Sequence, residues 1–155
     1  MRRSKLELDD YLPYLINRVG TALALRFTAD QLAAHGISIA MWRVLAVLSS
    51  NGGQRQIDLA ALTSIDASTL SRLVTRLVRM GVVSRTRSRT NSREVLVSLS
   101  AKGRAIVDRL VPAALSLEDA LGRGLSQRDG TIVKRALRRM YANLSRRGGH
   151  VADDG

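Results

Sequence analysis

The sequence predicts a mainly α-helical chain that carries one small β-hairpin, which is an α+β fold. Apolar residues recur at the three- and four-residue spacing of helices through most of the chain, and the period changes to two only after Gly81. Hydrophobic residues make up 45% of the 155 residues, which is enough to form one buried core. Capping residues and glycines separate the apolar segments, so the elements can be assigned in order.

The first element is a long helix that we expect to run from Asp9 or Asp10 to about His35, where Gly36 ends it. Pro13 is tolerated in the first turn, because the N–H groups there have no helical partner. A helix of roughly 25 residues is longer than a small core requires. We therefore expect part of it to pack on something outside the domain, through the apolar stripe of Leu12, Ile16, Val19, Leu23 and Phe27.

The second element is a helix over residues 39–48, which Ser38 can cap and in which Arg43 is the only charge. A helix that is apolar nearly all round is buried, so this one should be the central helix of the core. Residues 51–53, Asn-Gly-Gly, predict a turn. A short apolar helix then follows over residues 56–62.

Residues 65–80 form the most informative segment. Asp66 can cap a helix here, because its carboxylate accepts hydrogen bonds from the free N–H groups of the first turn. One face of that helix is apolar, with Leu70, Leu73, Val74, Leu77 and Val78. The opposite face holds no acid and carries Ser68, Thr69, Ser71, Arg72, Thr75, Arg76 and Arg79. Hydroxyls and guanidiniums suit a phosphate-lined groove whose base edges accept hydrogen bonds, although a solvated helix face is the alternative.

Only three residues, 63–65, connect this helix to the preceding one, which is the helix-turn-helix pattern. Residues 82–86 and 94–99 then predict two strands, and apolar and polar residues alternate in the second. The connection between the strands holds three arginines, Arg87, Arg89 and Arg93. A hairpin that follows a helix-turn-helix is a wing, so the predicted fold is a winged helix-turn-helix.

The C-terminal third predicts two more helices. Ser100 caps the first, over residues 101–121, and Pro112 should kink it. Its apolar residues have coiled-coil spacing and are Val107, Leu110, Ala114, Leu117 and Leu121. Ser126 caps the last helix, whose apolar face consists of Val133, Ala136, Leu137, Met140, Tyr141 and Leu144. Residues 148–155 should be a frayed tail.

Positive charge is concentrated around the helix-turn-helix and the wing. The whole chain has a net charge of +12, which favours a nucleic acid or an acidic membrane as partner. Residues 68–105 supply +8 of this total, because their only acid is Glu94 and their nine basic residues are Arg72, Arg76, Arg79, Arg85, Arg87, Arg89, Arg93, Lys102 and Arg104. Aromatic residues make up only 3%, which disfavours stacking on single strands. We therefore expect double-stranded DNA as the partner.

The sequence lacks the residues that several other classes of protein require. There is no cysteine and there are two histidines, His35 and His150, so we expect neither a metal site nor a cofactor. No nucleophile–base arrangement or phosphate-binding glycine loop is present, so we expect no enzyme. No apolar run approaches the ~20 residues of a membrane span, and we expect a soluble, cytoplasmic protein. A basic membrane-surface protein and a winged-helix module for protein–protein contacts are the alternatives.

The order of elements resembles the MarR family of dimeric winged-helix transcription regulators. The matching segments are Ile57-Asp58-Leu59-Ala60, Asp66-Ala67-Ser68-Thr69-Leu70-Ser71-Arg72-Leu73-Val74, Leu77-Val78-Arg79-Met80-Gly81-Val82-Val83-Ser84-Arg85 and Val95-Leu96-Val97-Ser98-Leu99-Ser100-Ala101-Lys102-Gly103. The resemblance implies that residues 68–80 enter the major groove and that Arg93 at the wing tip reaches the minor groove. The family usually has Asp-x-Arg at the wing where this chain has Asn91, and a Ser or Thr where this chain has Arg55.

The resemblance also implies a homodimer built by the outer helices. The corresponding division is residues 1–36 as an N-terminal dimerisation helix, 37–100 as the DNA-binding domain, 101–147 as C-terminal dimerisation helices and 148–155 as a flexible tail. A two-fold dimer binds a near-palindromic operator with half-sites about one helical turn apart. We expect such a regulator to act as a repressor.

Members of that family are often released from DNA by a small ligand that lies between the dimer helices and the winged domain. Phenolic acids, or their CoA thioesters in some relatives, are such ligands. The candidate effector-binding residues, which offer apolar walls and cations for an acid, are Arg18, Phe27, Met41, Trp42 and Arg43. The alternative is that the three apolar residues belong to the core and that Arg43 pairs with a carboxylate.

Overall fold

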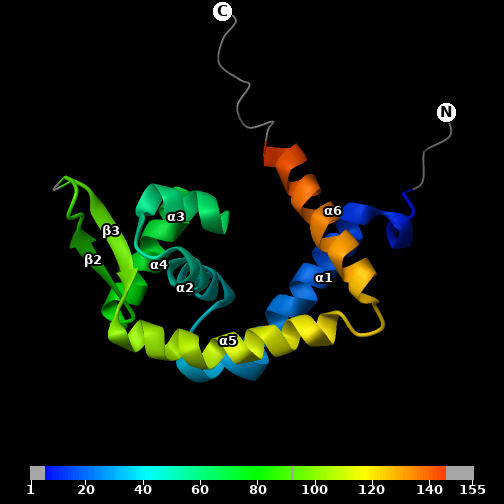
Figure 1. The fold of residues 1–155 in the computed structure, drawn as a ribbon, viewed down its shortest axis with the longest axis horizontal. Coiled ribbons are helices and arrows are strands. Elements are labelled where there is room, and N and C mark those ends of the chain that lie inside the picture. The colour runs from blue at the N-terminus through cyan, green and yellow to red at the C-terminus, as the bar shows by residue number, and fades with distance from the viewer. Residues whose placement is uncertain (1–5, 92, 146–155) are drawn as a thin grey trace, which may run out of the picture. The chain divides into compact units, whose positions relative to one another are not determined.

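The computed structural model describes residues 6–91 and 93–145, and Figure 1 shows their course. The chain divides into two compact units, the first ending at Leu117 and the second beginning at Glu118. The first unit holds the helix-turn-helix and a three-stranded sheet. The predicted tail, residues 148–155, lies outside the described residues.

The N-terminal helix begins later than predicted. Helix α1 spans Leu12–Phe27, and a separate 3-10 turn, Leu8–Asp10, precedes it. The predicted start at Asp9 or Asp10 is therefore wrong. Pro13 excludes a helix capped by Asp9, because such a helix would need an N–H from Pro13 as a donor to the Asp9 carbonyl. Where α1 does begin, Pro13 lies in the first turn and the missing N–H has no cost.

The end of this helix also departs from regular α geometry. A π-helical turn, Thr28–Leu32, and a 3-10 turn, Ala33–His35, follow α1, and Gly36 ends the run with φ 65°. Phe27 and Leu32 are both buried. In a straight α-helix two residues five apart point about 140° away from each other. The wider π turn lets both side chains enter the same core.

Helix α2, Ile39–Asn51, is the central helix that the sequence predicts. The Ser38 hydroxyl accepts the backbone N–H of Met41 at 3.2 Å, so Ser38 caps it as expected. Its buried residues are Met41, Val44, Leu45 and Leu48. The helix extends through Asn51, so the predicted turn begins at Gly52, whose φ of 75° suits glycine.

The sheet has three antiparallel strands, and the last strand in sequence lies between the other two. Strands β2, Val83–Arg87, and β3, Val95–Leu99, form the predicted hairpin, and each strand end lies within one residue of its predicted position. The sequence analysis missed β1, Gln54–Arg55, which pairs with β3 through Gln54 opposite Val97. A strand of two residues has no alternating pattern, so only its pairing partner reveals it.

The helix-turn-helix consists of α3, Gln56–Thr63, and α4, Ala67–Arg79. Ser64 lies between them in the left-handed region, with φ 55°. Leu70, Val74 and Leu77 of α4 are buried, which confirms the predicted apolar face. Gly81, at φ 72°, follows the helix and allows the chain to turn into β2.

The junction between α4 and the helix that follows the sheet, α5 (Ala101–Leu121), explains the motif Ser-Ala-Lys-Gly at residues 100–103. The Ser100 hydroxyl donates to the Gly81 carbonyl at 2.6 Å and accepts the N–H of Gly103 at 3.0 Å. The Lys102 ammonium donates to the Met80 carbonyl at 3.0 Å, at the C-terminal end of α4. Helix α5 is therefore anchored to the end of α4, and Pro112 lies within it.

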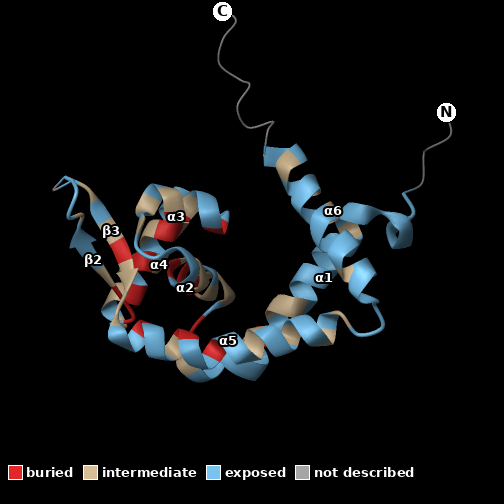
Figure 2. Ribbon diagram, viewed as in Figure 1, coloured by how far each residue is buried: buried red, intermediate tan, exposed pale blue. Residues whose placement is uncertain are grey.

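The core of the first unit lies where α2, α3, α4, the sheet and the start of α5 meet, and buried residues gather on these elements in Figure 2. Much of α1 is exposed, including apolar residues of its predicted stripe, Leu12, Ile16 and Val19. No described helix is by itself long and apolar enough to span a membrane; Leu12–His35 and Ile39–Asn51 meet that criterion only together, across a 79° bend.

The second unit contains α6, Gln127–Ser145. Ser126 caps it as predicted, because its hydroxyl accepts the N–H of Asp129 at 3.1 Å while its own N–H donates to the Asp129 carboxylate. None of the residues of α6 is buried. The apolar face predicted for this helix is largely exposed, at Val133, Leu137, Tyr141 and Leu144.

Candidate nucleic-acid interface

The N-terminal end of α4 is organised by Asp66. Its Oδ1 atom accepts the backbone N–H of Thr69 at 2.9 Å and the hydroxyl of Ser68 at 2.8 Å. These bonds confirm the predicted cap. The Ser68 hydroxyl donates its proton to Asp66, so the Ser68 Oγ atom can only accept a hydrogen bond from a partner in solvent. Ser68 is thus oriented by the cap itself.

The charge of the Asp66 carboxylate matters for this cap. Hydrogen bonds from Thr69 and Ser68 lower the pKa of Asp66 from 3.8 to about 2. A carboxyl whose pKa is lower in the folded state stabilises the fold above its unfolded pKa and stops doing so as pH falls through the folded pKa. Its contribution is therefore complete above about pH 4 and is lost toward about pH 2.

Asp66→Asn keeps an oxygen that can cap the helix but removes the charge. We expect this variant to unfold at a lower temperature than the wild type at neutral pH, and we expect the difference to shrink between about pH 4 and pH 2. Thermal unfolding at a series of pH values measures it. A difference that does not change with pH would show that the charge of the cap does not stabilise the fold.

The outer face of α4 presents the polar residues that the sequence predicts. Ser68, Arg72 and Arg76 are exposed, and Thr69, Ser71 and Thr75 are partly exposed. The Arg72 guanidinium donates to the Thr69 hydroxyl at 3.2 Å, within the helix. The helix thus presents hydroxyls and guanidiniums outward while its leucines face the core.

Arg85 of β2 links the hairpin to α4. Its Nη2 atom donates to the Thr75 hydroxyl of α4 at 3.2 Å. Side chains two apart on a strand share a face, so Arg85 lies on the same side as the buried Val83 and is directed at the helix. Sequence reasoning did not include Arg85 among the site residues, although this alternation was visible.

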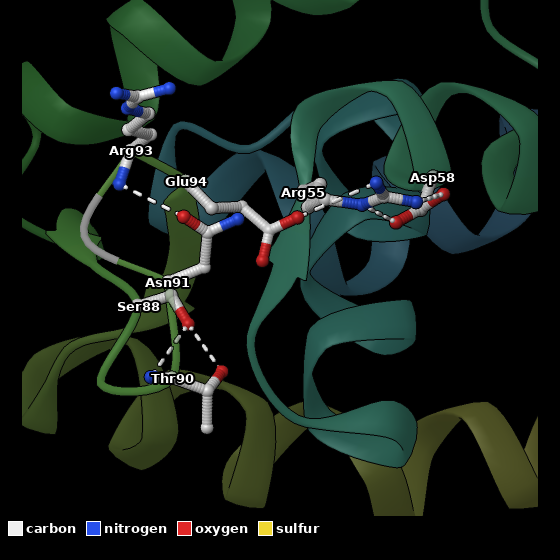
Figure 3. Close-up of polar contacts among 7 residues, drawn as sticks. All are labelled: Arg55, Asp58, Ser88, Thr90, Asn91, Arg93 and Glu94. Atoms are coloured by element: carbon white, nitrogen blue, oxygen red, sulfur yellow. Dashed lines mark hydrogen bonds and ion pairs between the residues drawn. The ribbon is translucent and has the colours of Figure 1, made fainter.

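The hairpin carries the three predicted arginines, Arg87, Arg89 and Arg93, all exposed. The amide oxygen of Asn91 accepts the backbone N–H of Arg93 at 3.2 Å, and the Asn91 carbonyl accepts the N–H of Glu94 at 2.9 Å. Asn91 therefore supplies a side-chain oxygen to the turn as an aspartate can, but without the negative charge. Figure 3 shows the Arg93 side chain extending away from Glu94 and Arg55.

Where the hairpin loop meets β3, Arg55 lies between two carboxylates, those of Asp58 and Glu94 (Figure 3). Its Nε and Nη2 atoms donate to the two oxygens of Asp58, at 2.6 and 2.9 Å, and its Nη1 atom lies 3.4 Å from Oε1 of Glu94. The hydrogen bond from Arg55 lowers the pKa of Asp58 and raises that of Arg55. Arg55 precedes α3 without capping it through its side chain. The sequence analysis singled out Arg55 only because the family usually has a Ser or Thr at this position.

The candidate effector-binding residues are divided between core and surface. The rings of Phe27 and Trp42 meet edge to face, with centroids 5.4 Å apart, and Met41 is buried beside them in the core cluster. Arg18 is exposed and lies over the Tyr14 ring at 5.7 Å, and Arg43 is exposed on α2. The structure therefore brings Phe27 and Trp42 into contact and leaves both arginines at the surface.

A cavity of about 320 Å³ lies between the end of α2, β3 and the start of α5. It is lined by Leu48, Ser49, Gly52, Gly53, Ser98, Leu99, Arg104 and Asp108, and so by none of the five candidate effector-binding residues. Within residues 6–91 and 93–145, no three histidine or acidic side chains are grouped in a way that could hold a metal ion.

Known proteins resemble the chain along most of its length. The model of the MarR family matches residues 37–95. An HTH-type transcriptional repressor of Mycobacterium tuberculosis is 30% identical over 101 residues, which cover 65% of this chain and 72% of the repressor. The crystal structure of a MarR-family transcriptional regulator from Silicibacter pomeroyi is 29% identical, with a TM-score of 0.79, and the match covers 97% of this chain and 100% of that one.

A structural neighbour with lower sequence identity is BpsR of Bordetella bronchiseptica, whose DNA binding is regulated by 6-hydroxynicotinic acid. It is 23% identical, with a TM-score of 0.78, and the match covers 89% of this chain and 98% of BpsR. The shared winged-helix fold, the exposed polar face of α4 and the sequence matches agree. The chain belongs to the MarR family, and it is a DNA-binding transcriptional regulator rather than an enzyme.

Proposed function

We propose that this regulator is a homodimeric repressor that binds a near-palindromic DNA operator and is released by a small aromatic acid or its CoA thioester. In this proposal α4 enters the major groove, where Ser68, Thr69, Ser71, Arg72, Thr75 and Arg76 meet the DNA. Arg87, Arg89 and Arg93 of the hairpin contact the backbone and the minor groove. Residues 37–100 bind DNA, and residues 1–36 and 101–147 form the dimer.

The observation that carries this proposal is the outward face of α4 together with the hairpin next to it. The helix buries its leucines and exposes hydroxyls and guanidiniums, and Arg85 joins it to the arginine-bearing hairpin. Phosphates bind such a surface, and base edges accept hydrogen bonds from it. We expect the protein to be cytoplasmic, because a DNA-binding regulator must share a compartment with the chromosome.

Selection of bound DNA from a random pool, followed by gel shifts at several salt concentrations, tests this proposal. We expect enrichment of a near-palindrome with half-sites about 10 base pairs apart. If six to ten phosphates are contacted, affinity should fall by ~10³- to 10⁵-fold between 50 and 200 mM salt. Vesicles of anionic lipid are the control. No enrichment, or equal capture by vesicles, would contradict sequence-specific DNA binding.

Apolar side chains that are exposed to solvent in the described chain support the proposed dimer. In α1, Leu12, Ile16 and Val19 are exposed, and in α6 Leu137 is 45% exposed although it lies in the middle of the apolar face. We expect sedimentation to show a particle of twice the chain mass. Leu137→Gln should weaken the dimer because it adds a polar group to this face, whereas Arg138→Gln on the adjacent face should not. A wild type that stays monomeric would refute the roles given to the outer helices.

The proposed effector is an aromatic acid or thioester. The regulation of BpsR by 6-hydroxynicotinic acid supports this chemical class. In this chain Phe27, Met41 and Trp42 would offer apolar contacts, and Arg18 and Arg43 would offer cations to the carboxylate. The gel shift repeated with a panel of such acids and thioesters tests the idea, and a compound that lowers operator affinity would support it.

A further inference from the structure

One acidic residue stands out on the proposed DNA-binding surface. Glu94 is the only acid between residues 68 and 105, where nine basic residues lie. A carboxylate near phosphates repels them, so its presence there has an electrostatic cost. Its side chain is 30% exposed, and Glu94 ends the hairpin loop, directly before the first residue of β3. Its position therefore calls for a structural explanation.

The Arg55 guanidinium connects Glu94 to the helix-turn-helix. Arg55 is the last residue of β1 and pairs with Leu96 of β3 in the sheet. Two of its nitrogen atoms bind the carboxylate of Asp58 in the first turn of α3, and the third lies 3.4 Å from Glu94. One planar group thus touches both α3 and the end of the hairpin loop, as Figure 3 shows.

We propose that Arg55 and Glu94 are positioning residues that brace the wing against the first helix of the helix-turn-helix. The brace holds the hairpin, and with it Arg93, in one orientation before DNA arrives. The conformational entropy of a loose hairpin is then already lost in the free protein, so less is lost on binding. The inference rests on the DNA binding proposed above, but its effect on the hairpin exists without DNA.

Direct contact of Arg55 with phosphate is the competing explanation. Its guanidinium already faces two carboxylates, Asp58 and Glu94, which offset its charge. The two explanations differ in sign for Glu94→Gln. By charge alone, removal of an acid from a basic surface should strengthen DNA binding. If Glu94 braces the wing, the same substitution should weaken operator binding.

The first experiment measures operator affinity by fluorescence anisotropy for Glu94→Gln and Arg55→Gln. An exposed ion pair has a modest effect, so we expect affinity between about two- and fivefold weaker for each variant, with no change in denaturation midpoint. Glu118→Gln is the matched control, because it removes an acid from an exposed ion pair with Lys134 in the second unit. Unchanged or stronger binding by Glu94→Gln would overturn the brace.

The second experiment repeats both substitutions in an Arg93→Ala background. If Arg55 and Glu94 act by presenting Arg93, their effects should largely disappear there. Full additivity would mean that Arg55 contacts DNA itself, and the proposal would be wrong.

A third measurement separates the brace from the proposed function. Amide hydrogen exchange across residues 87–95 of the free protein should speed up in Glu94→Gln and Arg55→Gln and should not change in Glu118→Gln. Unchanged exchange in the first two variants would refute the brace even if DNA binding is confirmed. A wild type that binds no DNA would refute the proposed function, while the exchange rates would still decide whether the brace exists.

Discussion

Gly103→Ala should destabilise the protein by about 3 kcal/mol, because the site has no space for a methyl group. A Cβ atom built on Gly103 would overlap the Val82 carbonyl oxygen and would lie 3.0 Å from the Val82 carbonyl carbon. The backbone of Val82 cannot easily retreat. Its oxygen accepts the N–H of Ser100 at 3.1 Å, and its own N–H donates to the Leu77 carbonyl at 3.1 Å. Relief of the clash would break this junction between α4, β2 and α5.

Gly130→Ala is the matched control for this prediction. It is the same substitution within a helix, but a Cβ at Gly130 meets nothing within 4 Å. Alanine favours helices over glycine by up to ~1 kcal/mol, so this variant should be slightly more stable than the wild type. Urea denaturation of both variants measures the two changes. Equal midpoints for Gly103→Ala and the wild type would show that α5 does not approach the Val82 carbonyl this closely.

Arg72→Ala should weaken operator binding by ~1–3 kcal/mol and relax the preference at one or two base pairs. The Arg72 side chain is exposed near the start of α4, and its one described hydrogen bond, to Thr69, stays within the helix. Its guanidinium is therefore available to a base edge, where guanine offers two acceptors. Arg76→Ala should behave in the same way, because it lies one turn further along the same face.

The measurement compares affinity for the selected operator with affinity for random DNA, at one salt concentration. Arg109→Ala removes an equal charge from an exposed position on α5 and should have little effect on either. If Arg72→Ala lowers both affinities equally, Arg72 contacts phosphate and does not read sequence. If it lowers neither, α4 is not the element that enters the groove.

Much of the fold follows from the sequence because the interactions that decide it are local. Ser38, Asp66, Ser100 and Ser126 each bond the N–H of a residue three positions later, and these caps set the starts of four helices. The buried face of α4 repeats at helical period, so its exposed face, with every predicted contact residue on that helix, could be named as well. The arginines of the hairpin follow from the change of period after Gly81.

Tertiary structure decided the features that depend on residues distant in sequence. Strand β1 exists because Gln54 and Arg55 pair with β3, and the link between Arg85 and Thr75 exists because β2 packs against α4. The steric demand for glycine at residue 103 comes from the Val82 carbonyl. Hydrogen bonds within one turn are set by residue type and spacing alone. Contacts between segments require the core to bring two surfaces together, and no local pattern records which surfaces meet.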